Sequence, residues 1–291
     1  MMKKRSLKIF SILLILLSLP TLSFGAKPKK PMKVSAIMEN ASGIYELANS
    51  EIASAHYLQA EEHLDEAAKL SFSVDNTDLL CKISLSRAVI KYYTNSSPDE
   101  YLAKAKKYAS RSTDGAFLLA VCRLYEMDLV SSTADLDSLA ELEKQFLKQP
   151  YYLSYLYRIK GNHLARNSEY KKAELAYLKA AEIHVSEAYI TEIGLDWYSI
   201  ARMRSIDGNK KGALEAIENA LKYDRDAENT SAIASDYFAR AMILVKGNPD
   251  KEEIESAIDD ADWAREIFIS GGYDAMAEKC RLFIEGHSGT K

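Results

Sequence analysis

The feature that most constrains the fold is a unit of sequence that occurs twice between Tyr157 and Asp224, with a shift of 40 residues. In each copy, a segment with bulky and small apolar residues is followed by a polar turn. Then come Ala, a large residue and Ala at positions i, i+4 and i+7, which places all three on one side of a helix. The first copy comprises Tyr157, Gly161, Leu164, Tyr170, Ala173, Tyr177 and Ala180, and the second comprises Trp197, Ile200, Ala201, Gly208, Ala213, Ile217 and Ala220. Such a pair of helices cannot bury its apolar side alone, so the unit predicts further pairs stacked on either side.

These residues resemble the pattern of the tetratricopeptide repeat (TPR) family. The resemblance implies helical hairpins that stack into a right-handed superhelix. The chain departs from the family at Lys160, where a leucine is usual, and at Arg204, where an aromatic residue is usual, and neither copy ends with the family's proline. The 40-residue shift also exceeds the ~34 residues of the standard repeat, which predicts lengthened helices. A shared fold does not fix a function, so the resemblance implies an architecture and no single activity.

The rest of the chain is compatible with the same architecture. Apolar residues at helical spacing recur from residue 40 to residue 285, least regularly in residues 77–147, and no stretch alternates as a β-strand would. We therefore predict an all-α, TPR-like α-solenoid of about six helical hairpins. The helix predicted from Ala275 to Ile284 would cap its last exposed face. Residues 286–291 are expected to form a short tail.

The first 25 residues have the features of a secretory signal peptide. Lys3, Lys4, Arg5 and Lys8 precede an almost wholly apolar run, and small residues lie three and one positions before a cut ahead of Ala26. The alternative is an uncleaved membrane anchor, although the run is shorter than the ~20 residues that a spanning helix needs. The sequence therefore predicts an exported protein, periplasmic or secreted. Residues 26–39, which contain two prolines, are expected to form an extended tether.

The charge balance excludes two classes of partner. The whole chain has a net charge of −4, and removal of the four basic residues of the leader makes it −8. A nucleic-acid-binding protein needs a basic face, and no long basic run follows residue 33. Binding to anionic lipid is disfavoured for the same reason, so we expect membrane contact only through an uncleaved leader.

No catalytic constellation is recognisable. The chain lacks Gly-x-Ser-x-Gly, Gly-x-x-x-x-Gly-Lys and His-Glu-x-x-His, so we predict neither an enzyme nor a cofactor. His56 and His63 provide too few ligands for a metal site. Cys81, Cys122 and Cys280 are the three cysteines. The first two fall on the first helices of consecutive pairs, where they are either small buried apolar residues or a disulfide pair.

The TPR resemblance places a candidate binding site on the concave face. In that family the first helices of successive repeats line the groove, and residues beside the packing stripe contact the ligand. Mapped onto this chain, the positions are Tyr155, Arg158, Asn162, Arg166, Tyr198 and Arg202. Two guanidinium groups beside an amide can grip a carboxylate or the backbone of an extended peptide. The alternative is that these arginines pair with nearby acidic residues and only solubilise the face.

The function expected from these features is binding without catalysis. The first hypothesis is an exported scaffold or adaptor that holds a protein or peptide in the concave groove. The second is a small-molecule-binding accessory of an envelope transport system, with the ligand in a cavity lined by tyrosine and arginine.

Overall fold

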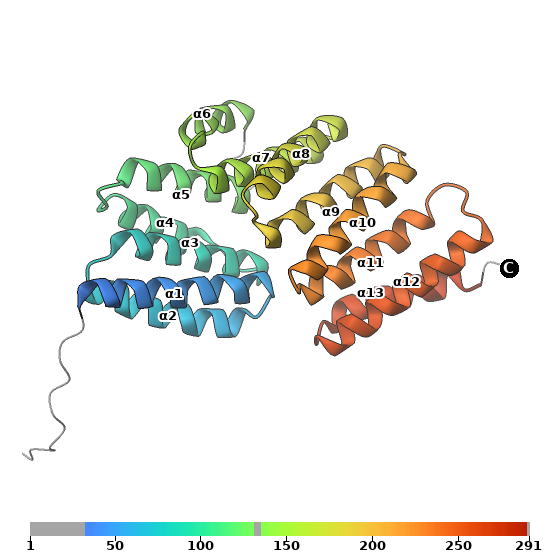
Figure 1. Cartoon of the computed structure of the whole chain (residues 1–291), viewed down its shortest axis with the longest axis horizontal. Coiled ribbons are helices and arrows are strands. Elements are labelled where there is room, and N and C mark those ends of the chain that lie inside the picture. The colour runs from blue at the N-terminus through green and yellow to red at the C-terminus, as the bar shows by residue number, and fades with distance from the viewer. Residues whose placement is uncertain (1–32, 131–134, 290–291) are drawn as a thin grey trace, which may run out of the picture.

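The computed structural model describes residues 33–130 and 135–289, and every regular element in those ranges is a helix. Consecutive helices pair as antiparallel hairpins that stack side by side in chain order (Figure 1). The helices are α1 (Val34–Ala53), α2 (Tyr57–Ser73), α3 (Thr77–Tyr93), α4 (Asp99–Ala109), α5 (Gly115–Leu129), α6 (Leu136–Phe146), α7 (Pro150–Arg166), α8 (Tyr170–Ser186), α9 (Ile190–Ile206), α10 (Lys210–Asp226), α11 (Thr230–Leu244), α12 (Lys251–Ser270) and α13 (Asp274–His287).

The predicted α-solenoid is confirmed. Six hairpins, from α1–α2 to α11–α12, are followed by α13, which packs on α12. The two sequence copies are α7–α8 and α9–α10. In the part of the chain that the structure describes, no helix has both the length and the hydropathy needed to cross a bilayer.

The boundaries of the helical domain differ from those expected. Helix α1 begins at Val34, so residues 34–39, which were expected to belong to an extended tether, form its first turns. The remainder of that tether and the whole of the predicted signal peptide lie outside the described residues. At the other end, Gly286 and His287, expected to be part of the tail, complete α13.

Small and large residues alternate in the core as the repeated unit requires. Ala173, Ala180, Ala213 and Ala220 are fully buried, and Tyr177 is 2% exposed. Alanine lets the backbones of neighbouring helices approach each other, and the large residues between the alanines fill the remaining space. The packing stripe predicted from the sequence is therefore the core of these hairpins.

Most turns between helices use one backbone geometry. Two residues after the end of a helix, the chain enters the left-handed region, as at Ala55 (φ 58°), Ala188 (φ 56°) and Glu228 (φ 54°). This conformation lets the next amide donate to the carbonyl at the helix end: the His56 amide donates to the Glu51 carbonyl at 2.8 Å. Gly208 adopts the same geometry without the steric cost that a side chain incurs.

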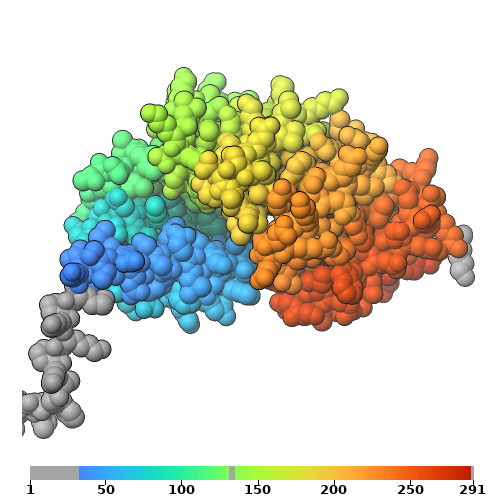
Figure 2. Space-filling model, in the orientation of Figure 1, coloured from blue at the N-terminus to red at the C-terminus, as the bar shows by residue number. Residues whose placement is uncertain are grey.

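The two ends of the solenoid touch each other. The hydroxyl of Tyr273, in the α12–α13 turn, donates a hydrogen bond of 2.9 Å to the carbonyl of Ser54, in the α1–α2 turn. Figure 2 shows the first hairpin, in blue, meeting the last helices, in orange and red, at this point. The arc of helices is thereby closed, and the first helices of the hairpins line its inner face.

Candidate functional site on the inner face

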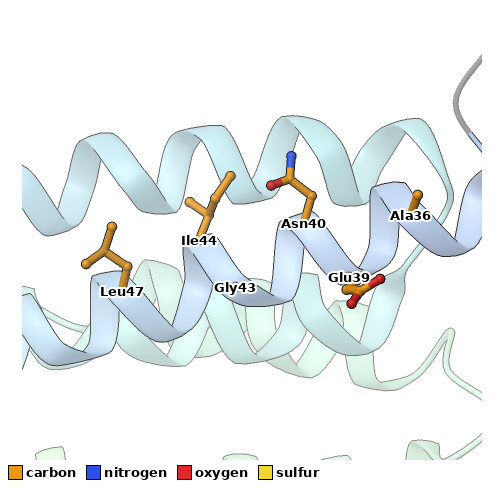
Figure 3. Close-up of a pocket in the computed structure, with 6 residues that line it drawn as sticks. All are labelled: Ala36, Glu39, Asn40, Gly43, Ile44 and Leu47. Atoms are coloured by element: carbon orange, nitrogen blue, oxygen red, sulfur yellow. The ribbon is translucent and has the colours of Figure 1, made fainter.

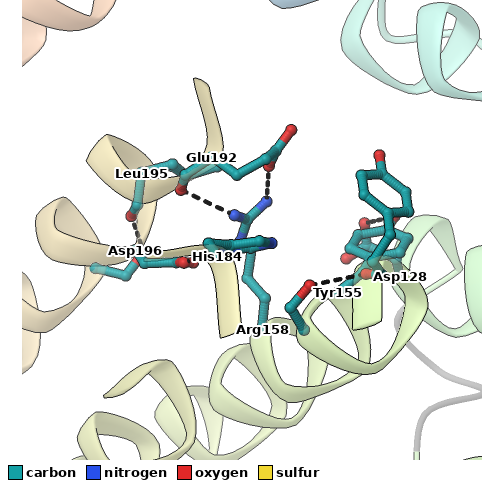
Figure 4. A network of polar contacts seen from close by, with 10 residues as sticks. Asp128, Tyr155, Arg158, His184, Glu192, Leu195 and Asp196 are labelled. Atoms are coloured by element: carbon teal, nitrogen blue, oxygen red, sulfur yellow. Dashed lines mark hydrogen bonds and ion pairs between the residues drawn. The ribbon is translucent and has the colours of Figure 1, made fainter. Parts of the chain in front are cut away.

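Arg158, on α7, is held by two carboxylates of α9. Its Nε donates to Oδ1 of Asp196 at 2.9 Å, its Nη1 to Oε2 of Glu192 at 2.6 Å, and its Nη2 to the Glu192 carbonyl at 3.1 Å. Only 11% of the Arg158 side chain is exposed (Figure 4). Arg158 therefore pairs with nearby acids, as the alternative interpretation of the sequence had it, and its role in ligand binding stays a prediction.

The network extends to a third helix through His184, for which no site role was predicted from the sequence. Nδ1 of His184, on α8, lies 2.5 Å from Oδ2 of Asp196, and both side chains are buried. Burial alone would raise the pKa of Glu192, but the charge and hydrogen bond of Arg158 outweigh it and lower that pKa. Arg158 of the fourth hairpin thus bonds to two carboxylates of the fifth, and this fixes the register between α7 and α9.

Tyr155 and Asp128 form a second polar contact one hairpin earlier. The Tyr155 hydroxyl donates to Oδ2 of Asp128, on α5, at 2.6 Å (Figure 4). Burial raises the pKa of Asp128, opposed by this hydrogen bond and by the positive charge of Arg158. The rings of Tyr155 and Tyr125 meet edge to face at 5.1 Å between centroids. Tyr155 lies on the inner face as expected, with its hydroxyl already bonded.

Asn162 is oriented by a tyrosine of the second helix in its own hairpin. Tyr177, on α8, passes its ring beside Gly161, where a Cβ would lie 2.6 Å from the nearest ring carbon. Its hydroxyl then donates to Oδ1 of Asn162 at 2.7 Å. The Asn162 side chain also forms a hydrogen bond with Asp128, which opposes the rise that burial causes in the pKa of that carboxyl group. The missing side chain at Gly161 is what makes this arrangement possible.

Arg166 and Arg202 are the two predicted site residues whose charges remain available. Both are exposed, and neither forms a hydrogen bond or an ion pair with another residue in ranges 33–130 and 135–289. Burial raises the pKa of Tyr177 to about 12, and the charges of Arg202 and Arg166 oppose that rise. Burial also raises the pKa of Tyr198, again opposed by Arg202. The two guanidinium groups, from α7 and α9, therefore both lie close enough to Tyr177 to influence its hydroxyl group.

Further tyrosines come together from the first, third and fourth hairpins. Burial raises the pKa of Tyr125, Tyr151 and Tyr152 above its ordinary value, and in each case the neighbouring Tyr45, on α1, contributes to the rise. These side chains come from α1, α5 and α7, so aromatic residues of three hairpins lie near one another at the N-terminal end of α7.

A buried carboxyl pair joins the fifth and sixth hairpins. Asp224, on α10, and Asp236, on α11, are 2% and 1% exposed and share a hydrogen bond. Burial, together with the charge of Asp224, raises the pKa of Asp236 to about 9. Two carboxyl groups can share a hydrogen bond only if one is protonated. Gly194, on α9, makes room for the pair, because a Cβ there would lie 2.3 Å from the Asp224 oxygens.

Within the described ranges, no three His, Cys, Asp or Glu side chains are placed to hold a metal ion. A depression that the surface does show lies along α1 alone and contains none of the candidate residues (Figure 3). Its lining residues are Ala36, Glu39, Asn40, Gly43, Ile44 and Leu47.

The acidic partners of Arg158 were not predicted from the sequence. Glu192 and Asp196 lie 34 and 38 positions after Arg158, close to the 40-residue shift of the repeat. A search for acidic residues one repeat away from each inner-face arginine would have found them. No comparable signal marks His184 or the Asp224–Asp236 pair.

Comparison with known proteins identifies the architecture. No family model and no curated protein matches the sequence. Among solved structures, aspartyl phosphate phosphatase F from Bacillus subtilis matches with 15% identity, 88% coverage of this chain, 72% coverage of its own, and a TM-score of 0.52. A Rap protein complexed with competence and sporulation factor matches with 15% identity, coverages of 89% and 76%, and a TM-score of 0.58. The apo form of RapI matches with 12% identity, coverages of 86% and 97%, and a TM-score of 0.50. Identities this low show the fold alone, which is that of TPR-like helical repeat proteins.

Proposed function

We propose that this protein is a non-catalytic scaffold that binds a protein or peptide on the inner face of its solenoid, outside the cytosol. The observation that carries the proposal is the pair Arg166 and Arg202, two exposed guanidinium groups without a partner among the described residues. Other arginines of the chain, such as Arg204 and Arg240, bond to acidic groups of the protein itself. An anionic group on a binding partner would form ion pairs with Arg166 and Arg202.

The surroundings of these two arginines favour an extended peptide segment. Guanidinium groups bind carboxylates through paired hydrogen bonds, and the side chains of Arg166 and Arg202 are both exposed. Tyr198 offers a broad apolar ring with a polar hydroxyl, a side chain that contributes much contact area at a small entropic cost. The Arg158 network holds α7 and α9 in fixed register, so the site is organised before the partner arrives.

The solved structures support binding in general terms. One similar structure is a Rap protein complexed with competence and sporulation factor, so this architecture can hold a partner. Another is named a phosphatase, and that activity is not transferred at 15% identity. Export is supported by residues 1–25 of the sequence alone.

A small-molecule ligand is the second candidate, and one observation favours it. The hydroxyls of Tyr125, Tyr151 and Tyr152 form no hydrogen bond with another residue in the described ranges, although all three lie near one another. A metabolite with several polar groups would bond to them. Native mass spectrometry of the purified protein would then show a bound small molecule.

Photo-crosslinking tests the proposed site. A photoreactive phenylalanine analogue at position 198 should crosslink one partner in the native cell, which mass spectrometry would identify. The double change Arg166→Glu and Arg202→Glu should abolish the crosslink, because it replaces both attractive charges with repulsive ones. The matched control is Arg111→Glu, which reverses an exposed charge in the α4–α5 turn. Undiminished crosslinking in the double variant, with an unchanged circular dichroism spectrum, would refute the placement of the site.

A further inference from the structure

Cys81 and Cys122 meet at the junction of the second and third hairpins. Cys81 lies on α3 and Cys122 on α5, and their sulfur atoms are 3.7 Å apart. Both side chains are fully buried. No protein disulfide is present, so the two residues face each other as thiols. The neighbour relation expected from the sequence is thus confirmed.

The geometry points to Cys81 and Cys122 as a disulfide-forming pair that covalently joins hairpins two and three when the protein is in an oxidising compartment. A disulfide needs its sulfur atoms about 2.0 Å apart, so small rotations of the two side chains suffice to bring them together. The compartment is one that keeps disulfides oxidised, such as the periplasm or the extracellular space.

The two thiols differ in acidity. The hydrogen bond from Cys81 lowers the pKa of the Cys122 thiol; burial opposes this effect and the positive charge of Lys106 adds to it. The same hydrogen bond, with burial, raises the pKa of Cys81. Since the thiolate is the nucleophile in exchange, either thiol can start the reaction once it is deprotonated, and one of the two routes begins at Cys122.

The reaction balances with one external disulfide, for example oxidised glutathione. The Cys122 thiolate attacks one sulfur of that disulfide, its S–S bond breaks, and one glutathione thiolate leaves. Cys81 then gives its proton to solvent and attacks the Cys122 sulfur, which expels the second glutathione thiolate. Two protein thiols are oxidised and one external disulfide is reduced. Because both cysteines are buried, the exchange takes place during folding or local opening.

Cys280 provides an internal control. It is buried on α13, in a different apolar cluster from both other cysteines. Burial raises the pKa of its thiol to about 11. With no cysteine beside it and little thiolate at neutral pH, Cys280 should remain a thiol while the other two are oxidised.

The experiment is to refold the mature protein in a buffer of reduced and oxidised glutathione, quench with acid, and count thiols in denaturant. We expect one free thiol, a mass lower by two hydrogen atoms, and a peptide map that joins Cys81 to Cys122. The Cys280→Ala variant should form the same bond and retain no thiol. Cys122→Ala should form no internal disulfide, and its melting temperature should not change with oxidant, whereas that of the wild type should rise.

Two outcomes would overturn the inference. One is that three thiols remain in the wild type. The other is a stable glutathione adduct on Cys122, because that would show that Cys81 does not reach the Cys122 sulfur. Both readouts come from the wild-type chain and therefore do not depend on whether any variant folds.

Discussion

Asp224 and Asp236 make the stability of this protein depend on a single proton. Burial raises the pKa of Asp224 to about 6, and burial with the charge of Asp224 raises that of Asp236 to about 9. Arg225, on α10, opposes the rise for Asp236, and Glu218 adds to it. One oxygen of Asp236 is buried without a hydrogen-bond partner, so no hydrogen-bond donor stabilises a negative charge on that oxygen.

The direction of the pH dependence follows from where the proton is held. An unfolded aspartate titrates near pH 4, so from about pH 4 upwards the unfolded chain has lost a proton that the folded chain keeps. The stabilisation that the buried proton provides is complete below about pH 4. It is lost as the pH rises through the pKa of Asp236 in the folded protein, which is about 9. Between about pH 6 and pH 8 the folded state holds one extra proton. The free energy of unfolding therefore falls by about 1.4 kcal/mol per pH unit, which amounts to about 2.7 kcal/mol over that interval.

The perturbation is Asp236→Asn, which replaces the shared proton with an amide that can donate to Asp224 at every pH. Urea unfolding at about pH 6 and pH 8 would measure the free energy of unfolding of the variant and of the wild type. Between these two pH values, we expect the free energy of unfolding of the wild type to fall by about 2.7 kcal/mol relative to that of the variant. The control is Asp226→Asn on α10, the helix of Asp224, where the carboxyl group is exposed and the difference should stay constant. Parallel pH profiles for the wild type and Asp236→Asn would refute the shared proton.

Three further predictions test the packing at Gly161, the contact between the two ends of the solenoid, and the Arg158 network. Gly161→Ala should lower the free energy of unfolding by about 1–3 kcal/mol, because its Cβ would overlap the Tyr177 ring; an unchanged urea midpoint would contradict this. Tyr273→Phe removes the hydrogen bond to Ser54 and should increase the radius of gyration in small-angle scattering. An unchanged radius of gyration would contradict the contact between the two ends in solution. Arg158→Met leaves the buried carboxylates of α9 uncompensated and should cost about 3–5 kcal/mol in chemical denaturation, and a loss below about 1 kcal/mol would argue against that ion pair.

The hairpin architecture was predictable because it depends on contacts that are close in sequence. Ala173 and Ala213 mark the packing stripes of two successive units, and a helix buries residues at spacings of three and four whatever surrounds it. The turns were less visible, since Ala55 and Ala188 adopt a left-handed conformation that sequence patterns associate with glycine. Helix pairing imposes that conformation, and local propensity does not reveal it.

The candidate site could be placed on the inner face, but which of its members remain available could not be foreseen. Arg158 and Arg166 are the same residue type on the same side of α7, yet Arg158 is bonded to Glu192 and Asp196 while Arg166 is exposed. Whether a guanidinium is free depends on which carboxylates the next hairpin presents, which is set by the stacking angle between units. A side-chain pattern within one helix contains no information about that angle.

Helical hairpins with a common packing stripe follow from the amino-acid pattern, because that information lies within about 40 residues. The contact between the two ends of the solenoid, through Tyr273 and Ser54, which are 219 positions apart, became visible only in the three-dimensional structure. The meeting of Asp224 and Asp236 in the core likewise became visible only there. Small rotations between successive hairpins accumulate along a solenoid, and the position of its far end is therefore fixed by all the interfaces together.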